Sequence, residues 1–135
     1  MRPVTAVSLP CLCLVTDRKL CDDDSLVERV AAAVAGGVDM VQLREKDLPG
    51  SQLLQLARQL RDVTAGRALL FVNDRVDVAL ACAADGVQLG EQGLPVDAAR
   101  DVAGRRLLIG RSVHSVEGAV AAQGEGADLL LVGTI

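Results

Sequence analysis

The 135-residue sequence contains no tryptophan and no tyrosine, and its single aromatic residue is Phe71. Proteins that bind single-stranded nucleic acid stack bases on aromatic side chains, and large protein interfaces are often anchored by them. The sequence also lacks an excess of basic residues, since 14 Lys and Arg face 18 Asp and Glu for a net charge of -4. These absences argue against nucleic acid as a partner and favour small-molecule chemistry.

Metal-finger and membrane-spanning patterns are missing as well. The four cysteines, Cys11, Cys13, Cys21 and Cys82, form no CxxC pair, and the only histidine, His114, cannot complete a zinc set with them. No apolar run approaches the roughly 18 residues that cross a bilayer, and no apolar segment with a small-residue cleavage site opens the chain. We therefore interpret the cysteines as small apolar core residues and expect a cytoplasmic protein without membrane contact.

Half of the residues are apolar, which is enough to bury a sizeable core. Short apolar runs alternate with segments of helical period and no linker interrupts them, a rhythm typical of βαβ units in one domain over residues 1–135. Runs such as LLFV and LLLV are apolar at every position, which predicts strands of a parallel sheet buried on both faces. The expected strands are 11–16, 38–43, 68–72, 87–89, 107–110 and 129–132.

The helices between these strands have recognisable starts and ends. After the acidic run 22–24, Ser25 followed by Glu28 predicts a capped helix start, and Gly36 predicts its end. Pro49 opens a second helix that runs to Gly66. Further helices are expected at 74–83, 95–102 and 115–125. Six strands and five helices in this order fit either an open doubly wound sheet or part of a closed barrel.

Polar residues cluster where the expected strands end, which is the edge at which parallel α/β folds assemble their sites. Arg44 and Lys46 are two cations on one short loop and suit a phosphate or diphosphate. In the alternative interpretation, they form a solvated turn and pair with Glu45 and Asp47. The complete set of polar residues at strand ends is Gln42, Arg44, Lys46, Asn73, Asp74, Gln88, Ser112 and His114.

Two of these residues have both a chemical and a structural interpretation. Asp74 could hold magnesium together with substrate phosphates, or it could favour the start of the following helix. His114 stands next to Ser112 in GRSVHS, and histidine is the side-chain type most often used for proton transfer. It could act as an acid/base group, or it could be a structural hydrogen-bond donor. Neither GxGxxG after the first strand nor GxxxxGK[ST] is present, which argues against a dinucleotide or P-loop site.

Six sequence segments in this order resemble the thiamine phosphate synthase/TenI superfamily. They are LVTD at 14–17, VQLREKD at 41–47, VNDRVDVAL at 72–80, DGVQLG at 85–90, GRSVHS at 110–115 and GADLLLVGTI at 126–135. Each segment is a weak signal alone, but six in the right order and spacing are specific. The resemblance implies a (β/α)8 barrel of the TIM type, incomplete here, with about six parallel strands and five helices.

For a synthase, the resemblance implies a site that works by stabilising charge on a leaving group, without a nucleophile. Hydroxymethylpyrimidine diphosphate would lose its diphosphate, and a thiazole phosphate would capture the resulting cation to give thiamine phosphate. Mg²⁺ would be the cofactor, held by Asp74, and Ser112 would bond a departing phosphate oxygen. The residues implied to hold the diphosphate are Gln42, Arg44, Lys46, Asn73 and Ser112.

Two departures from the synthase pattern point to the TenI branch. The pattern usually has aspartate, a second magnesium ligand, where this chain has Gly93, and a usual histidine is replaced by Gln88. Glu91 is near enough in sequence to substitute for the lost carboxylate. His114 aligns with the acid/base histidine of thiazole tautomerases, which need no metal. The synthase is favoured over the tautomerase because the Asn73-Asp74 pair is retained.

In this family, the chain continues beyond the sixth strand into two further βα units. The resemblance therefore implies that the 135-residue chain is an N-terminal portion with little activity alone, because such barrels bind phosphate after strands seven and eight. A homo-oligomer or a complementing C-terminal segment would cover the exposed sheet edges. The expected ligands are phosphorylated pyrimidine and thiazole substrates.

Overall fold

A computed structural model describes residues 6–21 and 25–134, so the acidic run 22–24 and Ile135 lie outside the described residues. Within these ranges the elements alternate as expected from the sequence. The strands are β1 (Cys13–Val15), β2 (Met40–Leu43), β3 (Leu69–Asn73), β4 (Gly86–Leu89), β5 (Leu108–Val113) and β6 (Leu129–Val132). The helices are α1 (Leu26–Ala35), α2 (Gly50–Thr64), α3 (Val76–Ala81), α4 (Val96–Ala103) and α5 (Val116–Gly124), and a 3-10 turn spans Arg18–Leu20.

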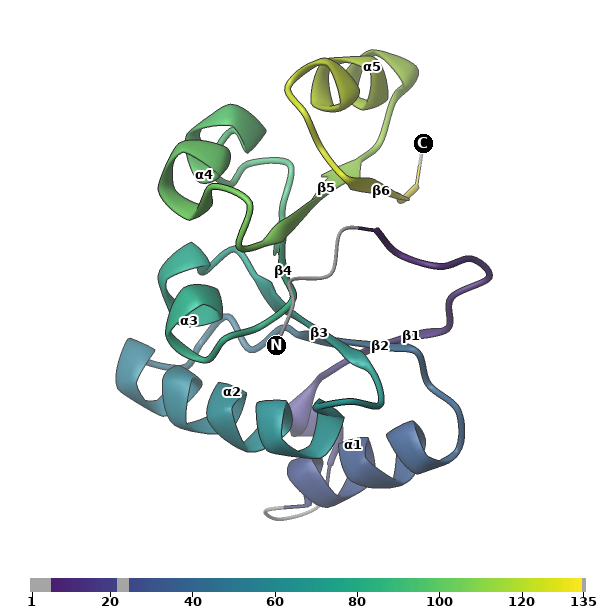
Figure 1. Cartoon of the computed structure of the whole chain (residues 1–135), viewed down its shortest axis with the longest axis vertical. Coiled ribbons are helices and arrows are strands. Elements are labelled where there is room, and N and C mark those ends of the chain that lie inside the picture. Colours follow the sequence, from purple (N-terminus) through teal and green to yellow (C-terminus); the bar gives the residue numbers. More distant parts are fainter. Residues whose placement is uncertain (1–5, 22–24, 135) are drawn as a thin grey trace.

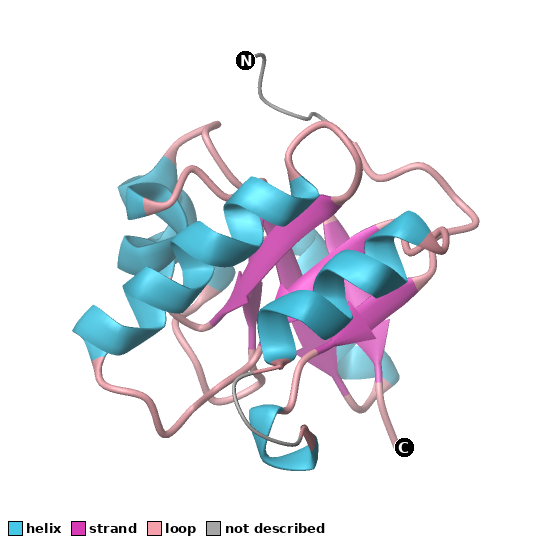
Figure 2. Cartoon of the chain, turned by 90° about the horizontal axis from the view of Figure 1, so that it is seen from below, coloured by secondary structure: helices cyan, strands magenta, loops and turns pink. Residues whose placement is uncertain are grey.

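The six strands form one parallel sheet in the order β1-β2-β3-β4-β5-β6. Figure 1 shows this sheet curling, with the helices along its outer side in chain order, and Figure 2 shows helices crossing in front of the strands when the molecule is seen from below. Consecutive neighbours throughout the sheet exclude a doubly wound order, in which the strand sequence reverses. The architecture is a curled half-barrel, as the sequence predicts.

The alternation of side chains along each strand divides the apolar residues between two faces of the sheet. Val41, Leu70 and Val87 point outward and pack under the helices with Leu53 and Leu60 in the larger core. A smaller cluster on the inner face consists of Met40, Phe71 and Leu108, with Val7, Cys11, Cys13, Leu69 and Leu129 packed against it. This arrangement confirms burial on both faces for β2, β3 and β4. The same expectation is wrong for the LLLV strand β6, where Leu131 is 38% and Val132 64% exposed because β6 lies at an edge of the sheet.

The four cysteines are free and serve as apolar packing residues, as predicted. Cys82 is buried in the outer core and Cys21 packs against it, whereas Cys11 and Cys13 pack against the inner cluster. No helix in the described parts of the chain has the length and apolar character needed to cross a membrane.

Three of the expected boundaries or caps need comment. The expected strand 107–110 is wrong at its C-terminal end, because β5 continues to Val113 through its pairing with β6, which places Ser112 within a strand. Ser115 caps α5, accepting a hydrogen bond from the backbone N–H of Gly118 at 3.0 Å. Ser25 precedes α1 without a side-chain cap to the helix, and its hydroxyl accepts instead from Arg29 Nε at 3.0 Å.

Three aspartates just before the even-numbered strands repeat one hydrogen-bond pattern at the N-terminal ends of the strands. The Oδ2 atoms of Asp39, Asp85 and Asp128 accept from the backbone N–H of the preceding odd strand, at Leu12, Leu70 and Ile109, over 2.8–2.9 Å. Each aspartate also donates its own backbone N–H to the carbonyl of that same residue. The strands are therefore joined in successive pairs at this end.

Candidate functional site

Inward-facing side chains change from apolar to polar along the strands, which creates the candidate site. In β2, Met40 lies in the inner cluster and Gln42 follows two residues later; in β3, Phe71 is followed by Asn73. Residues two apart in a strand lie on the same face. The polar residues therefore stand above the inner cluster, at the C-terminal ends of the strands.

One pocket at this end of the sheet collects most of the residues singled out in the sequence. It brings side chains from β2, β3 and β5 together with those of the adjoining loops. The predicted residues among them, from Gln42 to His114, are far apart in the sequence. Asp74 lines a neighbouring pocket that shares Lys46 and Asn73 with the first. The first pocket is lined by Val15, Gln42, Arg44, Lys46, Asn73, Gly90, Glu91, Ser112, His114 and Leu131.

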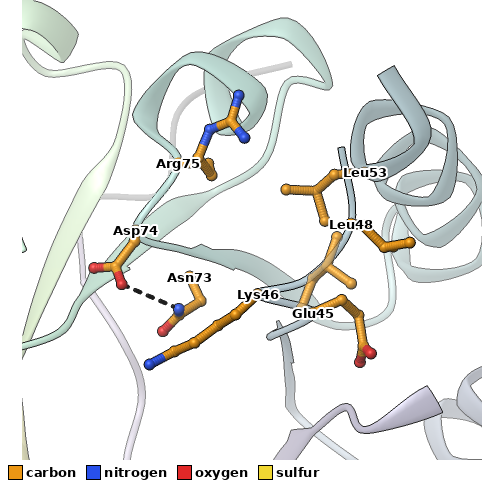
Figure 3. Close-up of a pocket in the computed structure, with 8 residues that line it drawn as sticks. Glu45, Lys46, Leu48, Leu53, Asn73, Asp74 and Arg75 are labelled. Carbon is orange, nitrogen blue, oxygen red and sulfur yellow. Dashed lines mark hydrogen bonds between the residues drawn. The ribbon is translucent and has the colours of Figure 1, made fainter. Parts of the chain in front are cut away.

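The loop that follows β2, residues 44–47 and here called the cation loop, alternates the direction of its side chains. Arg44 and Lys46 are exposed and line the pocket, whereas Glu45 between them is only 5% exposed. Figure 3 shows Lys46 extending alongside Asn73, with Glu45 pointing away from it. Within the described residues, neither the Arg44 nor the Lys46 side chain has a hydrogen-bond or ion-pair partner.

The acidic residues of the cation loop pair with cations from the segment after β1. Arg18 forms ion pairs with Glu45 at 3.1 Å and with Asp47 at 2.6 Å, and Lys19 lies 3.4 Å from Asp47. Hydrogen bonding from the Arg18 guanidinium holds the pKa of the Asp47 carboxyl well below its usual range. The alternative in which Arg44 and Lys46 pair with Glu45 and Asp47 is therefore wrong, because Arg18 already occupies both carboxylates.

The sequence analysis gave no role to Thr16 and Arg18, which hold the cation loop through its buried Glu45. Thr16 is 4% exposed, and its hydroxyl donates to Glu45 Oε2 at 2.7 Å while accepting from the backbone N–H of Arg44 at 3.0 Å. The signal that could have identified them is a hydroxyl at the end of one strand and a carboxylate after the next, since neighbouring parallel strands bring these positions together.

Two amide side chains connect the polar residues of neighbouring strands. Gln42 Nε2 donates to Asn73 Oδ1, and Asn73 Nδ2 donates to Asp74 Oδ2, both at 3.3 Å. Gln88, 2% exposed, donates through Nε2 to the hydroxyl of Ser112 at 3.2 Å. These contacts fix the orientation of the groups that face the pocket, and the Ser112 hydroxyl keeps its own proton available for a ligand oxygen.

Asp74 connects β3 to the loop after β4 and does not cap α3. Its backbone has φ of 60°, in the left-handed region, and its Oδ1 accepts from the backbone N–H of Gly90 at 2.8 Å. Arg75 occupies the cap position of α3, with no side-chain cap. The capping interpretation of Asp74 is therefore wrong, because this turn directs the carboxylate across to Gly90.

Gly93 lies directly beside the Asp74 carboxylate. A Cβ at Gly93 would lie 2.6 Å from Asp74 Oδ1, closer than real Cβ contacts, so an aspartate there would require the Asp74 carboxylate to move. The described residues contain no group of three or more His, Cys, Asp or Glu side chains that could hold a metal. One carboxylate and the oxygens of a bound phosphate can hold Mg²⁺. The donor set therefore fits an ion that arrives with a diphosphate.

His114 follows β5 and lies at the rim of the same pocket as the cations. Its Nδ1 is 3.0 Å from the carbonyl oxygen of Thr134, and its Nε2 is 3.6 Å from Glu91 Oε2. A ring whose Nδ1–H donates to a carbonyl keeps Nε2 as the atom that exchanges protons. Glu91, which the sequence offered as a substitute metal ligand, therefore lies beside His114 in this structure.

Comparisons with known proteins place this chain among thiamine-phosphate synthases by sequence similarity. A family model described as thiamine monophosphate synthase matches residues 12–135. The chain is 50% identical over 125 residues to a putative thiamine-phosphate synthase of Geobacter sulfurreducens, covering 92% of this chain and 59% of the relative. It is 52% identical over 111 residues to a thiamine-phosphate synthase of Gloeobacter violaceus, covering 82% of this chain and 33% of the relative.

A solved structure supports the same assignment. Thiamine phosphate pyrophosphorylase from Pyrococcus furiosus superposes with a TM-score of 0.86 at 43% identity, covering 93% of this chain and 60% of that one. An aldolase designated QR15 shares the fold alone, with a TM-score of 0.70 at 16% identity over 89% of this chain and 66% of that one. The chain thus spans less than two thirds of the length of these synthase relatives. On the family match and these identities, the chain belongs to the thiamine monophosphate synthase family.

Proposed function

We propose that this chain carries the diphosphate-binding half of a thiamine-phosphate synthase site, which couples hydroxymethylpyrimidine diphosphate with thiazole phosphate. The observation that carries the proposal is the pocket in which Arg44 and Lys46, with no acidic partner among the described residues, stand beside Gln42, Asn73 and Ser112. An anion with several oxygens is the ligand that two free cations and a set of amide and hydroxyl donors would bind.

The residues would promote the reaction by stabilising the negative charge that develops on the departing diphosphate. Arg44 would bind two oxygens through its planar fork, and Lys46 would add a point charge. Ser112, held by Gln88, would donate to a third oxygen. Mg²⁺ bound with the diphosphate at Asp74 would supply further neutralisation of that charge.

The test is an assay for thiamine phosphate from the two substrates, with and without Mg²⁺, using this chain and a form extended to the length of the Geobacter relative. Lys46→Ala should lower kcat/KM by about two orders of magnitude, because it removes a group that faces the developing charge. Asp74→Ala should abolish the response to Mg²⁺. Arg58→Ala, which removes an exposed cation of α2 outside the pocket, is the matched control and should retain activity. A folded extended form that makes no product would refute the proposal.

A second candidate function is isomerisation of a thiazole carboxylate phosphate, supported by the position of His114 in the same pocket. Its Nδ1 contact with a backbone carbonyl leaves Nε2 to exchange a proton with the ligand. Isomerisation moves a proton within the substrate and requires no metal. His114→Asn should abolish this activity and leave Mg²⁺-dependent coupling in place. Isomerisation at the wild-type rate in that variant would exclude the histidine as the proton carrier.

A further inference from the structure

The hydroxyl of Thr16 lies at the junction between the first two strands and bonds to two adjacent residues of the cation loop. It donates to Glu45 Oε2 at 2.7 Å and accepts from the backbone N–H of Arg44 at 3.0 Å. Thr16 and Glu45 are both buried, and Thr16 is tied to β2 by its own backbone N–H, which donates to the carbonyl of Gln42 at 3.0 Å. The start of the cation loop is therefore attached to the end of β1.

The segment after β1 also determines which charges in the cation loop remain free. Both Glu45 oxygens accept from the backbone N–H of Arg18, and its guanidinium bonds Glu45 and both oxygens of Asp47. With these carboxylates occupied, the two remaining charged side chains of the loop, Arg44 and Lys46, face the pocket. The four charges of the loop alternate in sign along the chain. Without the Arg18 guanidinium, the charges nearest in sequence to the two carboxylates would be Arg44 and Lys46.

We infer that Thr16, Glu45 and Arg18 are positioning residues that hold the cation loop in its anion-binding form, so that the segment after β1 sets the affinity of the site for diphosphate. The inference rests on the proposed function, because it assigns these residues to the binding of the same leaving group. None of the three lines the pocket itself. They would act through Arg44 and Lys46.

The first experiment measures binding of inorganic diphosphate to the chain by isothermal titration calorimetry at fixed Mg²⁺. Thr16→Val keeps the shape of the side chain but removes both hydrogen bonds, and we expect the Kd to rise about tenfold, the effect of one good hydrogen bond. Thr16→Ser restores the hydroxyl and should restore binding. The matched control is Thr64→Val, since Thr64 is fully buried and its hydroxyl donates to the carbonyl of Leu60 at 2.8 Å in α2.

A second pair of variants tests the charge arrangement without altering a buried residue. Arg18 has a side chain 33% exposed, so Arg18→Met should fold. It would remove the guanidinium from Glu45 and Asp47, which leaves Glu45 with Thr16 and the backbone N–H of residue 18, and leaves Asp47 with Lys19 alone. Lys46, next to Asp47 in sequence, would then compete for that carboxylate. We again expect about a tenfold higher Kd. The control is Arg29→Gln, which removes one positive charge from α1, where Arg29 contacts Ser25. It should bind diphosphate as the wild type does.

The outcomes separate this inference from the proposed function. Weakened binding in Thr16→Val and Arg18→Met, with normal binding in both controls, supports the inference. Normal binding in those two variants, while Arg44→Ala binds poorly, overturns the inference and leaves the proposed function standing. Equal losses in Thr16→Val and Thr64→Val overturn it as well, because binding would then follow stability. If Thr16→Val does not fold, Arg18→Met decides. A wild-type chain that does not bind diphosphate overturns the proposed function and the inference together.

Discussion

Asp85→Ala should destabilise the fold more than the same change at Asp128, although the two aspartates occupy equivalent positions before β4 and β6. Asp85 Oδ2 accepts from the backbone N–H of Leu70 at 2.8 Å and from Arg61 Nη1 at 2.9 Å. Arg61 already has a buried Nε without a partner. Removing the carboxylate leaves a largely buried guanidinium with only the carbonyl contacts to Ala83 and Ala68.

The magnitude follows from burial. The side chains of Arg61 and Asp85 are 14% and 11% exposed, against 24% and 29% for Arg100 and Asp128. Breaking a buried ion pair costs about 3–5 kcal/mol, and the remaining carbonyl contacts of Arg61 place Asp85→Ala near the lower end, at about 3 kcal/mol. Water reaches the second pair more easily, so Asp128→Ala should cost about 1.5 kcal/mol, as for a lost hydrogen bond to a charged group.

The free energy of unfolding should be measured by urea titration followed by far-ultraviolet circular dichroism, because the chain has no tryptophan or tyrosine for fluorescence. Arg61→Met in the Asp85→Ala background should recover part of the loss, since the guanidinium is then no longer left without its partner. Equal costs at the two aspartates, or no recovery in the double variant, would refute the argument from burial.

Three further predictions concern the core, the cation loop and a buried thiol. Gly86→Ala should destabilise the fold by about 1–3 kcal/mol in the same titration, because the new Cβ would meet the Phe71 ring at 2.5 Å. Arg18 lowers the pKa of the Asp47 carboxyl in the folded chain. The ion pair therefore stabilises the fold above the usual carboxyl pKa of about 4, and this contribution is lost as pH falls through the lower pKa of the folded state. Asp47→Asn should therefore flatten the acid limb of stability against pH, and an unchanged limb would contradict this. Cys82 is buried whereas the other three cysteines are partly exposed, and burial also raises the pKa of its thiol, so Cys82 should be the slowest cysteine to react with a thiol reagent in the folded chain, as read by peptide mass spectrometry.

The order of strands and helices could be predicted because the apolar pattern and the glycine positions indicated the same elements. Runs such as LLFV are apolar at every position, which fits only a strand buried on both faces, and Gly37, with φ of 113°, ends α1 where the periodicity stops. The expected end of β5 was too early because Arg111 and Ser112 are polar. Their strand conformation comes from pairing with β6, which local sequence does not report.

The membership of the pocket was also predictable, because polar residues that follow parallel strands must meet at one edge. The ion-pair partners of the charged residues in the cation loop were not predictable from the sequence of that loop alone. Asp47 is next to Lys46 in sequence, yet it pairs with Arg18, which comes from another strand connection 29 positions away. Likewise, the direction of the Asp74 carboxylate depends on a left-handed backbone turn, which a non-glycine residue adopts only in a particular tertiary setting.

The repeated aspartates stand at one end of the sheet, and the polar pocket stands at the other. Asp39, Asp85 and Asp128 hold strand pairs together where the strands begin, and Gln42 and Ser112 face the pocket where the strands end. Substitutions in the pocket therefore leave these strand-joining bonds intact. In evolutionary terms, this separation would let the polar residues of the pocket vary while the opposite end of the sheet keeps the bonds that join its strands.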